Sequence, residues 1–403
     1  MEIKKENIPV LFAKKEDCCG CGACMNICPQ KAISMIEDEG GFLYPKIDQS
    51  KCIQCEKCKN VCAFQHNEEC NQPLKTFAAV AKNKDIIKNS ASGGVFAAIA
   101  EQIIKEGGIV CGAAFQDDWS VHHIIIDNVN QIYKLQGSKY TQSNIDNTYT
   151  EVKKVLLQGK KVLYSGTPCQ IAGLYGYLGK HDDNLMTIDI VCHGVPNNRM
   201  FQDYIKQLEA NENGKVRQFT FRDKTIGWGK NGSVNIKADN KNYKKKLWES
   251  ASSYLYYFSK GWIQREGCYQ CKYACSNRPA DLTVGDYWGI EKVHSDYLGK
   301  KGWDESKGIS LVIANTENGL NLLQKVEKYV ELRPSSFEKA SMKNSQLNHP
   351  VAKGKRERMI QKYVEGGWKF LEKEFQEQVG WRKYTGFLKS WIPSCLKRFL
   401  KRL

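Results

Sequence analysis

Apolar runs of strand length alternate with amphipathic stretches over the middle of the chain. Runs typical of buried strands cover residues 76–82, 109–115, 121–127, 161–166 and 185–194. Stretches with helical periodicity, bounded by turn residues, cover residues 90–108, 151–160, 169–179 and 198–210. Strands that alternate with helices predict an α/β domain with a mostly parallel or mixed sheet.

A β-rich segment follows this domain. Residues 216–223 and 233–238 alternate between apolar and polar side chains, which predicts a hairpin. Between them, Gly227, Gly229 and Gly232 match the G-x-G-x-x-G pattern. A dinucleotide-binding loop needs a helix after this pattern, and strand-like sequence follows here, so we interpret the glycines as a turn.

Composition and charge limit the cellular setting and the partners. The N-terminus is charged, and no apolar stretch reaches the length of a signal core or a membrane helix. Seventeen cysteines in such a chain indicate the reducing cytoplasm. The net charge is +16, but no nucleic-acid-binding signature accompanies it, so we expect a basic surface that guides acidic partners and no binding of nucleic acid.

Eight cysteines near the N-terminus form two copies of the spacing C-x2-C-x2-C-x3-C. The copies are Cys18, Cys21, Cys24 and Cys28, then Cys52, Cys55, Cys58 and Cys62. This spacing binds [4Fe-4S] clusters, and in two-cluster ferredoxins the fourth cysteine of each run serves the other cluster. We therefore expect Cys62 to complete the first set and Cys28 the second. Zinc and disulfides are the alternatives, but zinc favours separated pairs and disulfides need an oxidising compartment.

A third cysteine group lies later in the chain. Cys268, Cys271 and Cys275 read C-x2-C-x3-C, which predicts another metal centre in a reducing compartment. We expect Cys192 as the fourth ligand, with Cys169 as the second choice. A zinc ion and unligated thiols are the alternatives.

Loops that follow the predicted strands carry candidate binding and catalytic residues. Residues 89–94 open a helix, where free backbone N–H groups bind phosphate; an ordinary serine N-cap is the alternative. Residues 165–170 occupy a strand-to-helix junction, where ligands bind in open α/β sheets. Cys169 lies at the mouth of that crevice, and His193, after the next strand, is a candidate proton donor or a structural histidine.

Several short motifs together resemble the beta-subunit family of coenzyme F420 hydrogenases and dehydrogenases, fused to a two-cluster ferredoxin. In chain order they are NSASGG at 89–94, GSKYTQS at 137–143, SGTPCQIAGL at 165–174, CHGVP at 192–196, ADLTVGDYWG at 280–289 and GISLVIANT at 308–316. The resemblance covers roughly residues 15–320. It implies FAD in the α/β domain and a further [4Fe-4S] cluster on the later cysteines.

The resemblance also assigns the flavin-binding residues. The residues expected near the FAD phosphates are Ser90, Ser92, Gly93 and Gly94. Those expected to line the flavin are Ser138, Lys139, Tyr140, Gly166, Thr167, Pro168 and Gln170. Catalytic roles are expected for His193 and Cys169.

The function that the resemblance implies is an iron–sulfur flavoprotein oxidoreductase. It would take electrons from a low-potential donor, such as ferredoxin or a hydrogenase-like subunit, and pass them through clusters and FAD to an organic acceptor. That acceptor is a deazaflavin coenzyme or, in bacteria, a polysaccharide-biosynthesis intermediate. The alternatives are an electron-transfer subunit without a substrate of its own and a redox sensor that keeps its clusters without a flavin.

These expectations divide the chain into four parts. Residues 1–68 form a two-cluster ferredoxin domain, residues 75–155 a flavin-binding region, residues 156–330 a domain with the third cysteine group, and residues 331–403 a helical, basic extension. The expected fold class is therefore mixed α+β and α/β: a bacterial dicluster ferredoxin domain, a mixed-sheet α/β flavin-binding domain and a helical tail.

The last part of the chain is strongly basic. Residues 381–403 hold seven lysines and arginines and no acid, with aromatic and leucine side chains at helix-like intervals. This pattern predicts either a helix on an anionic membrane, which would place the protein on the inner membrane face, or a helix docked on the protein's own core.

Overall fold

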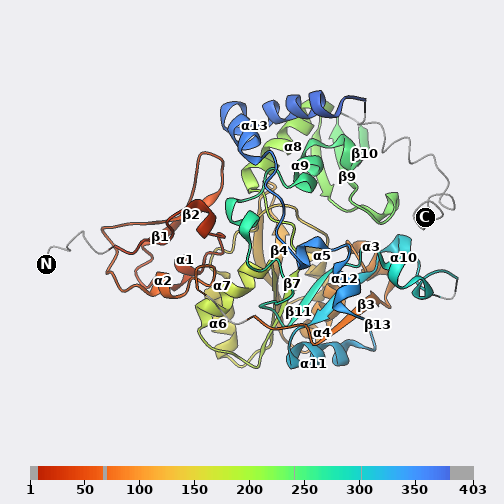
Figure 1. Cartoon of the computed structure of the whole chain (residues 1–403), viewed down its shortest axis with the longest axis horizontal. Helices are drawn as coiled ribbons and strands as arrows, with labels where there is room; N and C mark the ends of the chain where they lie inside the picture. Colours follow the sequence, from red (N-terminus) through yellow and green to blue (C-terminus); the bar gives the residue numbers. More distant parts are fainter. Residues whose placement is uncertain (1–7, 67–69, 240, 301, 382–403) are drawn as a thin grey trace.

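The computed structural model describes residues 8–66, 70–239, 241–300 and 302–381. A small N-terminal unit lies beside a large central sheet, and a smaller sheet packs under the long helix α13 (Arg356–Val379) (Figure 1). Residues 382–403 lie outside the described residues, so the predicted membrane contact of the tail stays a prediction. In the part of the chain that the structure describes, every helix is too short or too polar to span a bilayer.

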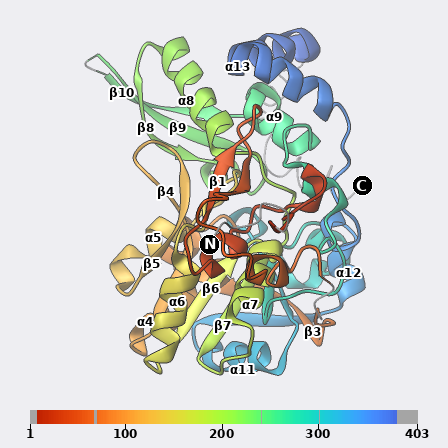
Figure 2. The same ribbon diagram turned by 90° about the vertical axis from the view of Figure 1, so that its left-hand side faces the viewer.

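The N-terminal unit is a pair of short helices beside a two-stranded antiparallel hairpin. Its elements are α1 (Ala23–Ile27), β1 (Ile33–Glu37), β2 (Leu43–Ile47) and α2 (Lys57–Asn60). Gly20 and Gly22 have φ values of +71° and +74°, which glycine adopts without strain, and they turn the loop tightly in front of α1. Helix α1 lies against α6 (Thr148–Leu157) and α7 (Pro168–Leu178) of the central domain (Figures 1 and 2).

The central domain is built on one mixed sheet with the strand order β13-β3-β12-β11-β7-β6-β4-β5. The strands are β3 (Lys75–Ala81), β4 (Ile109–Phe115), β5 (Val121–Ile126), β6 (Val162–Gly166), β7 (Leu185–Ile190), β11 (Leu282–Asp286), β12 (Ser310–Ala314) and β13 (Val330–Ser335). Strands β4, β6, β7 and β11 run parallel, and the outer strands pair antiparallel. The predicted mixed-sheet α/β architecture is confirmed.

Helices cover both faces of this sheet because its inner strands are apolar on both sides. In β6, Val162 and Tyr164 pack under α6 and α7, whereas Leu163 points to the opposite face. That face is covered by α4 (Val95–Lys105) and α11 (Glu317–Val326), which contact each other. The carboxyl ends of β6, β7 and β11 remain uncovered by these helices and open toward the smaller sheet.

The smaller sheet has the antiparallel order β10-β9-β8. Its strands are β8 (Lys215–Thr220), β9 (Gly232–Ala238) and β10 (Lys241–Leu247), so the predicted hairpin and its glycine turn are confirmed. An aromatic core that includes Phe201, Phe221, Tyr254 and Trp368 joins this sheet to α8 (Asn198–Glu212), α9 (Ser253–Lys260) and α13. Helix α13 is interrupted at residues 366–367 by two glycines with non-helical backbone angles.

The remaining elements are short. The helices are α3 (Lys84–Asn89), α5 (Ile132–Leu135), α10 (Ile290–Val293) and α12 (Phe337–Ser341). The 3₁₀ turns are η2 (Lys15–Asp17), η3 (Val129–Gln131), η4 (Lys224–Ile226), η5 (Glu249–Ala251), η6 (Glu266–Gln270), η7 (Ser295–Tyr297), η8 (Glu305–Lys307) and η9 (Ser345–Leu347). The predicted part that starts at residue 331 therefore begins inside strand β13 of the main sheet, and the division at residue 155 falls within α6.

Candidate functional site

The first group of thiols lies where the N-terminal unit meets the central domain; Cys21 is buried and the other three cysteines are partly buried. Cys62 and Cys24 both lie close to Cys18 and Cys21, although Cys62 is far from the others in sequence. Burial raises the pKa of the Cys24 and Cys62 thiols, and the neighbouring thiols raise it further. The structure therefore brings together the four cysteines that an exchanged fourth ligand requires.

The second group of thiols lies at the outer end of the same unit. Cys28, Cys52, Cys55 and Cys58 line one small apolar cavity, which isoleucine side chains complete. Cys55 is exposed, whereas Cys21 of the first group is buried. Each group brings four thiols together, and the second encloses a small apolar cavity, so their residues fit two [4Fe-4S] clusters.

A third cavity is lined by five thiols from distant parts of the chain. They are Cys19, Cys169, Cys192, Cys268 and Cys271. Within the described ranges, no three potential ligands converge closely enough to hold a single metal ion. Thiols spaced around a cavity fit a multi-iron cluster, whereas zinc needs its ligands around one point.

Cys275 does not line this cavity. Its thiol donates to the carbonyl oxygens of Lys272 and Asn277 at 3.2 and 3.3 Å. Cys169, predicted as the second choice for a fourth ligand and as a catalytic residue, does line the cavity. The Cys275 thiol is directed to the carbonyl groups of its own loop, and the ligand set stays a prediction.

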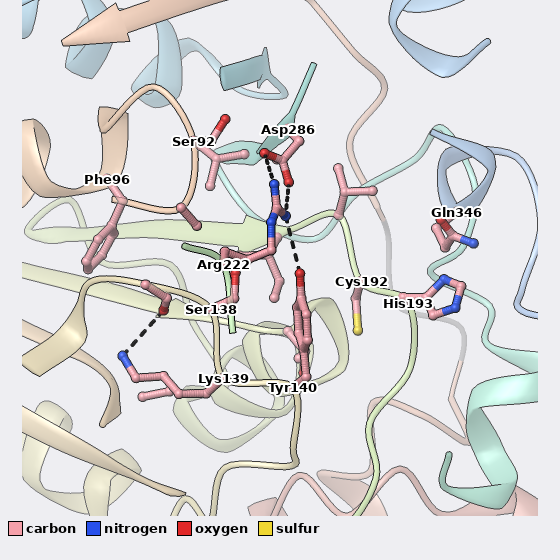
Figure 3. Close-up of a pocket in the computed structure, with 18 of the residues that line it drawn as sticks. Ser92, Phe96, Ser138, Lys139, Tyr140, Cys192, His193, Arg222, Asp286 and Gln346 are labelled. Carbon is pink, nitrogen blue, oxygen red and sulfur yellow. Dashed lines mark hydrogen bonds and ion pairs between the residues drawn. The ribbon is translucent and has the colours of Figure 1, made fainter. Parts of the chain in front are cut away.

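A large cavity of about 620 Å³ opens at the carboxyl ends of β6, β7 and β11 (Figure 3). This is the edge at which open α/β sheets bind ligands, and the volume is that of a cofactor site. The candidate residues that line it are Ser90, Ser92, Gly94, Ser138, Lys139, Tyr140, Gly166, Thr167, Gln170, Cys192 and His193. Residues predicted from separate motifs thus meet at one cavity.

Helix α4 begins at the cavity wall without a capping side chain. Its N-cap is Gly94, with a φ of +87°, so the first backbone N–H groups of the helix have no side-chain partner. Ser90 and Ser92 donate to the carbonyl oxygens of Ile86 and Ile309 instead of capping the helix. An uncapped helix N-terminus beside glycine favours an anion such as phosphate.

Gly93 serves packing and does not line the cavity. A Cβ atom at this position would lie 2.4 Å from the carbonyl oxygen of Ala79, and its N–H donates to the Ser310 hydroxyl at 2.9 Å. Helix α7, on the other face of the sheet, differs from α4 because Thr167 and Gln170 form its capping box. Pro168, at the start of α7, lines the third thiol cavity rather than the large one.

Lys139 places an ammonium group in the wall of the large cavity. The group donates to the carbonyl oxygens of Lys134 and Gln136, each at 2.9 Å, and burial lowers its pKa to about 7. Among the described residues, no carboxylate lies within ion-pair distance of it. A cation that lacks a counterion and borders a cavity is suited to an anionic ligand.

Arg222 and Asp286 join the smaller sheet to the rim of the cavity. The guanidinium makes a two-pronged contact with both carboxylate oxygens, at 2.6 and 3.0 Å, and donates to the Tyr140 hydroxyl at 3.2 Å (Figure 3). The Trp228 indole donates to the same carboxylate at 2.7 Å and stacks on Trp288. This ion pair is nearly buried and fixes Tyr140 at the cavity wall.

Comparisons with known proteins agree with this arrangement. Two family models describe the N-terminal and C-terminal parts of the coenzyme F420 hydrogenase/dehydrogenase beta subunit; they match residues 76–148 and 159–338. The chain belongs to this family. A 4Fe-4S dicluster domain matches residues 17–66, so the N-terminal unit of this beta-subunit homologue is a two-cluster ferredoxin domain.

Individual relatives are distant. The uncharacterized protein MJ1349 of Methanocaldococcus jannaschii is 25% identical over 368 residues, which cover 80% of this chain and 94% of that protein. The coenzyme F420-dependent sulfite reductase of the same organism is 27% identical over 173 residues, which cover 41% of this chain and 26% of that enzyme. A chain of the F420-reducing [NiFe] hydrogenase complex from Methanosarcina barkeri aligns with 77% of this chain and 94% of its own length, at 16% identity and a TM-score of 0.42. The family matches support an oxidoreductase that transfers electrons through iron–sulfur clusters.

His193 of this beta-subunit homologue is held by its surroundings. Its Nε2–H donates to the carbonyl oxygen of Ser259 at 3.2 Å, and burial lowers the pKa of the ring. Gln346 lies on its other side (Figure 3). These contacts hold the ring at the wall of the large cavity, and its role as a proton donor stays a prediction.

Two buried residues at the thiol groups had no motif to identify them. Arg265 is completely inaccessible and donates to Cys18, and Cys19 lies between the first and third groups. No role was predicted for Cys19, because it fits neither cysteine run. The only sequence feature that could have identified Cys19 is its position inside the first cysteine run, next to the predicted ligand Cys18.

Proposed function

We propose that this chain is an iron–sulfur flavoprotein oxidoreductase that passes electrons from a low-potential donor through three [4Fe-4S] clusters to FAD and on to an organic acceptor. The observation that carries the proposal is that the third thiol cavity and the large cavity share part of their lining. Thr167, Cys192, Gly194 and Val195 line both the third thiol cavity and the large cavity. A cluster on Cys169, Cys192, Cys268 and Cys271 would therefore border the flavin.

The residues of the large cavity fit FAD. The uncapped start of α4 would hold the phosphates, and Lys139 would face an electron-rich part of the cofactor. Tyr140, which is stacked on Phe258 at a centroid distance of 4.2 Å, gives the wall a fixed flat surface. When bound, FAD exchanges single electrons with clusters and a hydride with organic molecules, which is the conversion this chain needs.

The donor would dock beside the second thiol group. Cys55 is exposed there, and Ile53 next to it is 55% exposed. Lys51, Lys57 and Lys59 are also exposed on this loop and helix; Lys51 is paired with Asp48, and Glu56 is exposed beside Lys57. Lysines outnumber acids around this apolar centre, which favours an acidic one-electron carrier, such as a ferredoxin or a hydrogenase-like subunit.

The acceptor is the least constrained part of the proposal. The family name makes the deazaflavin coenzyme F420 the first acceptor to test. A nucleotide- or lipid-linked sugar from polysaccharide biosynthesis is the second candidate. Turnover by the isolated protein with either molecule separates this enzyme from an electron-transfer subunit that has no substrate of its own.

Anaerobic purification with iron, sulfide and flavin quantitation tests the proposal. We expect about twelve irons per chain, from three [4Fe-4S] clusters, and one FAD. Bound flavin should be reduced when a reduced ferredoxin is added. A preparation that keeps eight irons and no flavin after reconstitution would reduce the function to that of a two-cluster ferredoxin fused to an empty α/β domain.

A further inference from the structure

Arg265 lies buried at the junction between the ferredoxin domain and the central domain. Its side chain is 0% exposed, and its guanidinium donates from Nε to the carbonyl oxygen of Cys18 at 2.8 Å. A second N–H points at Cys18 Sγ at 3.5 Å, and a third donates to Gln142 Oε1 at 3.3 Å. The guanidinium carbon is 4.1 Å from the centre of the Tyr44 ring. The side chain of Arg265 thus belongs to the surroundings of the first thiol group.

The backbone of the same residue belongs to the third thiol group. The N–H of Arg265 donates to the carbonyl oxygen of Val195 at 2.8 Å, and its own carbonyl accepts from the N–H of Cys268 at 3.0 Å. Val195 and Cys268 both line the third cavity. Arg265 therefore connects the two groups through a single residue.

The charge of Arg265 has no carboxylate partner. In the described part of the chain, no carboxylate lies within ion-pair distance of its guanidinium, whereas Arg278, which lines the third cavity, is paired with Asp189 at 2.9 Å. A buried cation without a counterion is unstable unless another negative group lies nearby. Four cysteine thiolates around a cluster supply such negative charge.

The two domains are packed too closely at this junction for side chains to be added. A Cβ atom on Gly173 of α7 would lie 2.8 Å from Cys21 Sγ, and one on Gly267 would lie 2.9 Å from the carbonyl oxygen of Glu16. Cys19 is buried here, packs in one core cluster with Cys21 of the first group, and lines the third cavity together with Cys169. A thiol of the ferredoxin domain therefore contacts one proposed ligand of each cluster.

We propose that electrons cross between the two domains at this junction of Cys19 and Arg265, and that Arg265 is a positioning residue that sets the redox potential of the cluster on Cys18, Cys21, Cys24 and Cys62. The inference rests on the proposed function, because it needs clusters on both sides. Transfer of one electron oxidises the first cluster and reduces the third, forms and breaks no bond, and leaves the proton on Arg265. A buried cation and an N–H aimed at a cysteine sulfur both favour the reduced, more negative cluster.

The test compares R265Q, R265K and the control R199Q by redox titration followed by electron paramagnetic resonance. Arg199 also joins the ferredoxin domain to the central part, through Glu37 at 3.1 Å, but it contacts no thiol. In R265Q we expect reduction of one cluster to become at least tenfold less favourable, about 59 mV lower for a one-electron couple. R265K should shift in the same direction by less, because it keeps the charge and loses the forked donor. R199Q should match the wild type.

The iron content of each protein distinguishes a failure of this inference from a failure of the proposed function. Twelve irons with unchanged potentials in R265Q would overturn the inference and leave the proposed function intact. Eight irons in the wild type would overturn both. If R265Q does not fold, the redox potential measured for R265K decides the test, because it is expected to shift in the same direction.

A second variant tests Cys19 independently. C19A should retain all twelve irons, because Cys19 is a contact and not a ligand, and should reduce the bound flavin more slowly after rapid mixing with reduced ferredoxin. Loss of four irons in C19A would make Cys19 a ligand and overturn the assignment. An unchanged rate of flavin reduction would remove Cys19 from the path.

Discussion

The partly buried ammonium of Lys139 predicts that flavin binding depends on pH. Its pKa is lowered to about 7 by burial, and its hydrogen bonds go only to backbone carbonyls such as that of Gln136. An anionic or electron-rich group of FAD against this ammonium stabilises the protonated form and raises the pKa of Lys139 toward its ordinary value of 10.5. Binding of FAD should therefore be coupled to uptake of one proton.

The magnitude follows from the two pKa values. Below about pH 6 Lys139 is protonated with or without ligand, so the affinity should be constant. Above pH 7 the free protein loses the proton while the complex keeps it, and the dissociation constant should rise about tenfold per pH unit, or ~1.4 kcal/mol. Between pH 7 and pH 9 the loss should approach a hundredfold, or ~2.7 kcal/mol.

Calorimetric titration of the flavin-free protein with FAD, done anaerobically from pH 6 to pH 9, measures this slope. Two buffers with different ionisation enthalpies give the number of protons taken up. K139R should bind FAD with a flat pH profile, because arginine stays protonated, and K139M should bind weakly at every pH. A wild-type profile that is flat over this range would refute the reasoning, as would an equal slope in K139M.

Two histidines border the same cavity, and Lys224 lies behind its wall. His123 has its pKa lowered to about 4 by burial, so it is neutral throughout this pH range, and burial also lowers the pKa of His193. Lys224 has a pKa of about 8, and it donates to the carbonyl oxygen of Ser92 beside the start of α4. A slope that survives in K139R would therefore point to Lys224.

Three further substitutions test the rest of the site. C271A should lower the iron content by about four per chain, whereas C275A should leave it unchanged, because Cys271 lines the third cavity and Cys275 does not. G93A should lower the free energy of unfolding by about 1–3 kcal/mol in anaerobic urea titrations, because its Cβ would clash with the backbone of β3. D286N should cost about 3–5 kcal/mol in the same titration, because it leaves the guanidinium of Arg222 buried without its counterion. A stability equal to that of the wild type would show that the ion pair adds nothing to the junction of the two sheets.

The elements that sequence patterns predicted are those with a strong apolar signal. Strand β6 is apolar on both faces, and its parallel neighbours share that property, so they read as strands without knowledge of the fold. The edge strands β10 and β13 were among those missed, because their edge positions allow polar side chains that hide the apolar signal. Strand β10 reads KNYKKKL, and β13 contains Glu331, Arg333 and Pro334, all of which an edge tolerates.

The candidate site shows the same division between local and distant information. The exchange of Cys28 and Cys62 was predicted because the spacing of the cysteines encodes it. Cys169 was offered only as the second choice for a ligand of the third group, because it lies about a hundred residues from the C-x2-C-x3-C motif and only the fold brings it to the cavity of Cys268 and Cys271. Arg265 could not be predicted from local sequence either. Its proposed role depends on the contact between the segment before η6 and the loop of Cys18, which are about 250 residues apart in sequence.

The unequal burial of the two ferredoxin clusters gives the electron path a direction in space. Among the described thiols, only Cys55 of the second group is exposed, while the first group is enclosed by α7 and Arg265. If the proposed function holds, a one-electron carrier would approach the outer cluster, whereas an organic acceptor would approach the large cavity. Electrons would then cross the junction singly and leave the flavin in pairs. The junction is tightly packed, since a Cβ atom on Gly173 would lie 2.8 Å from Cys21 Sγ, so the path would run through residues of this one chain.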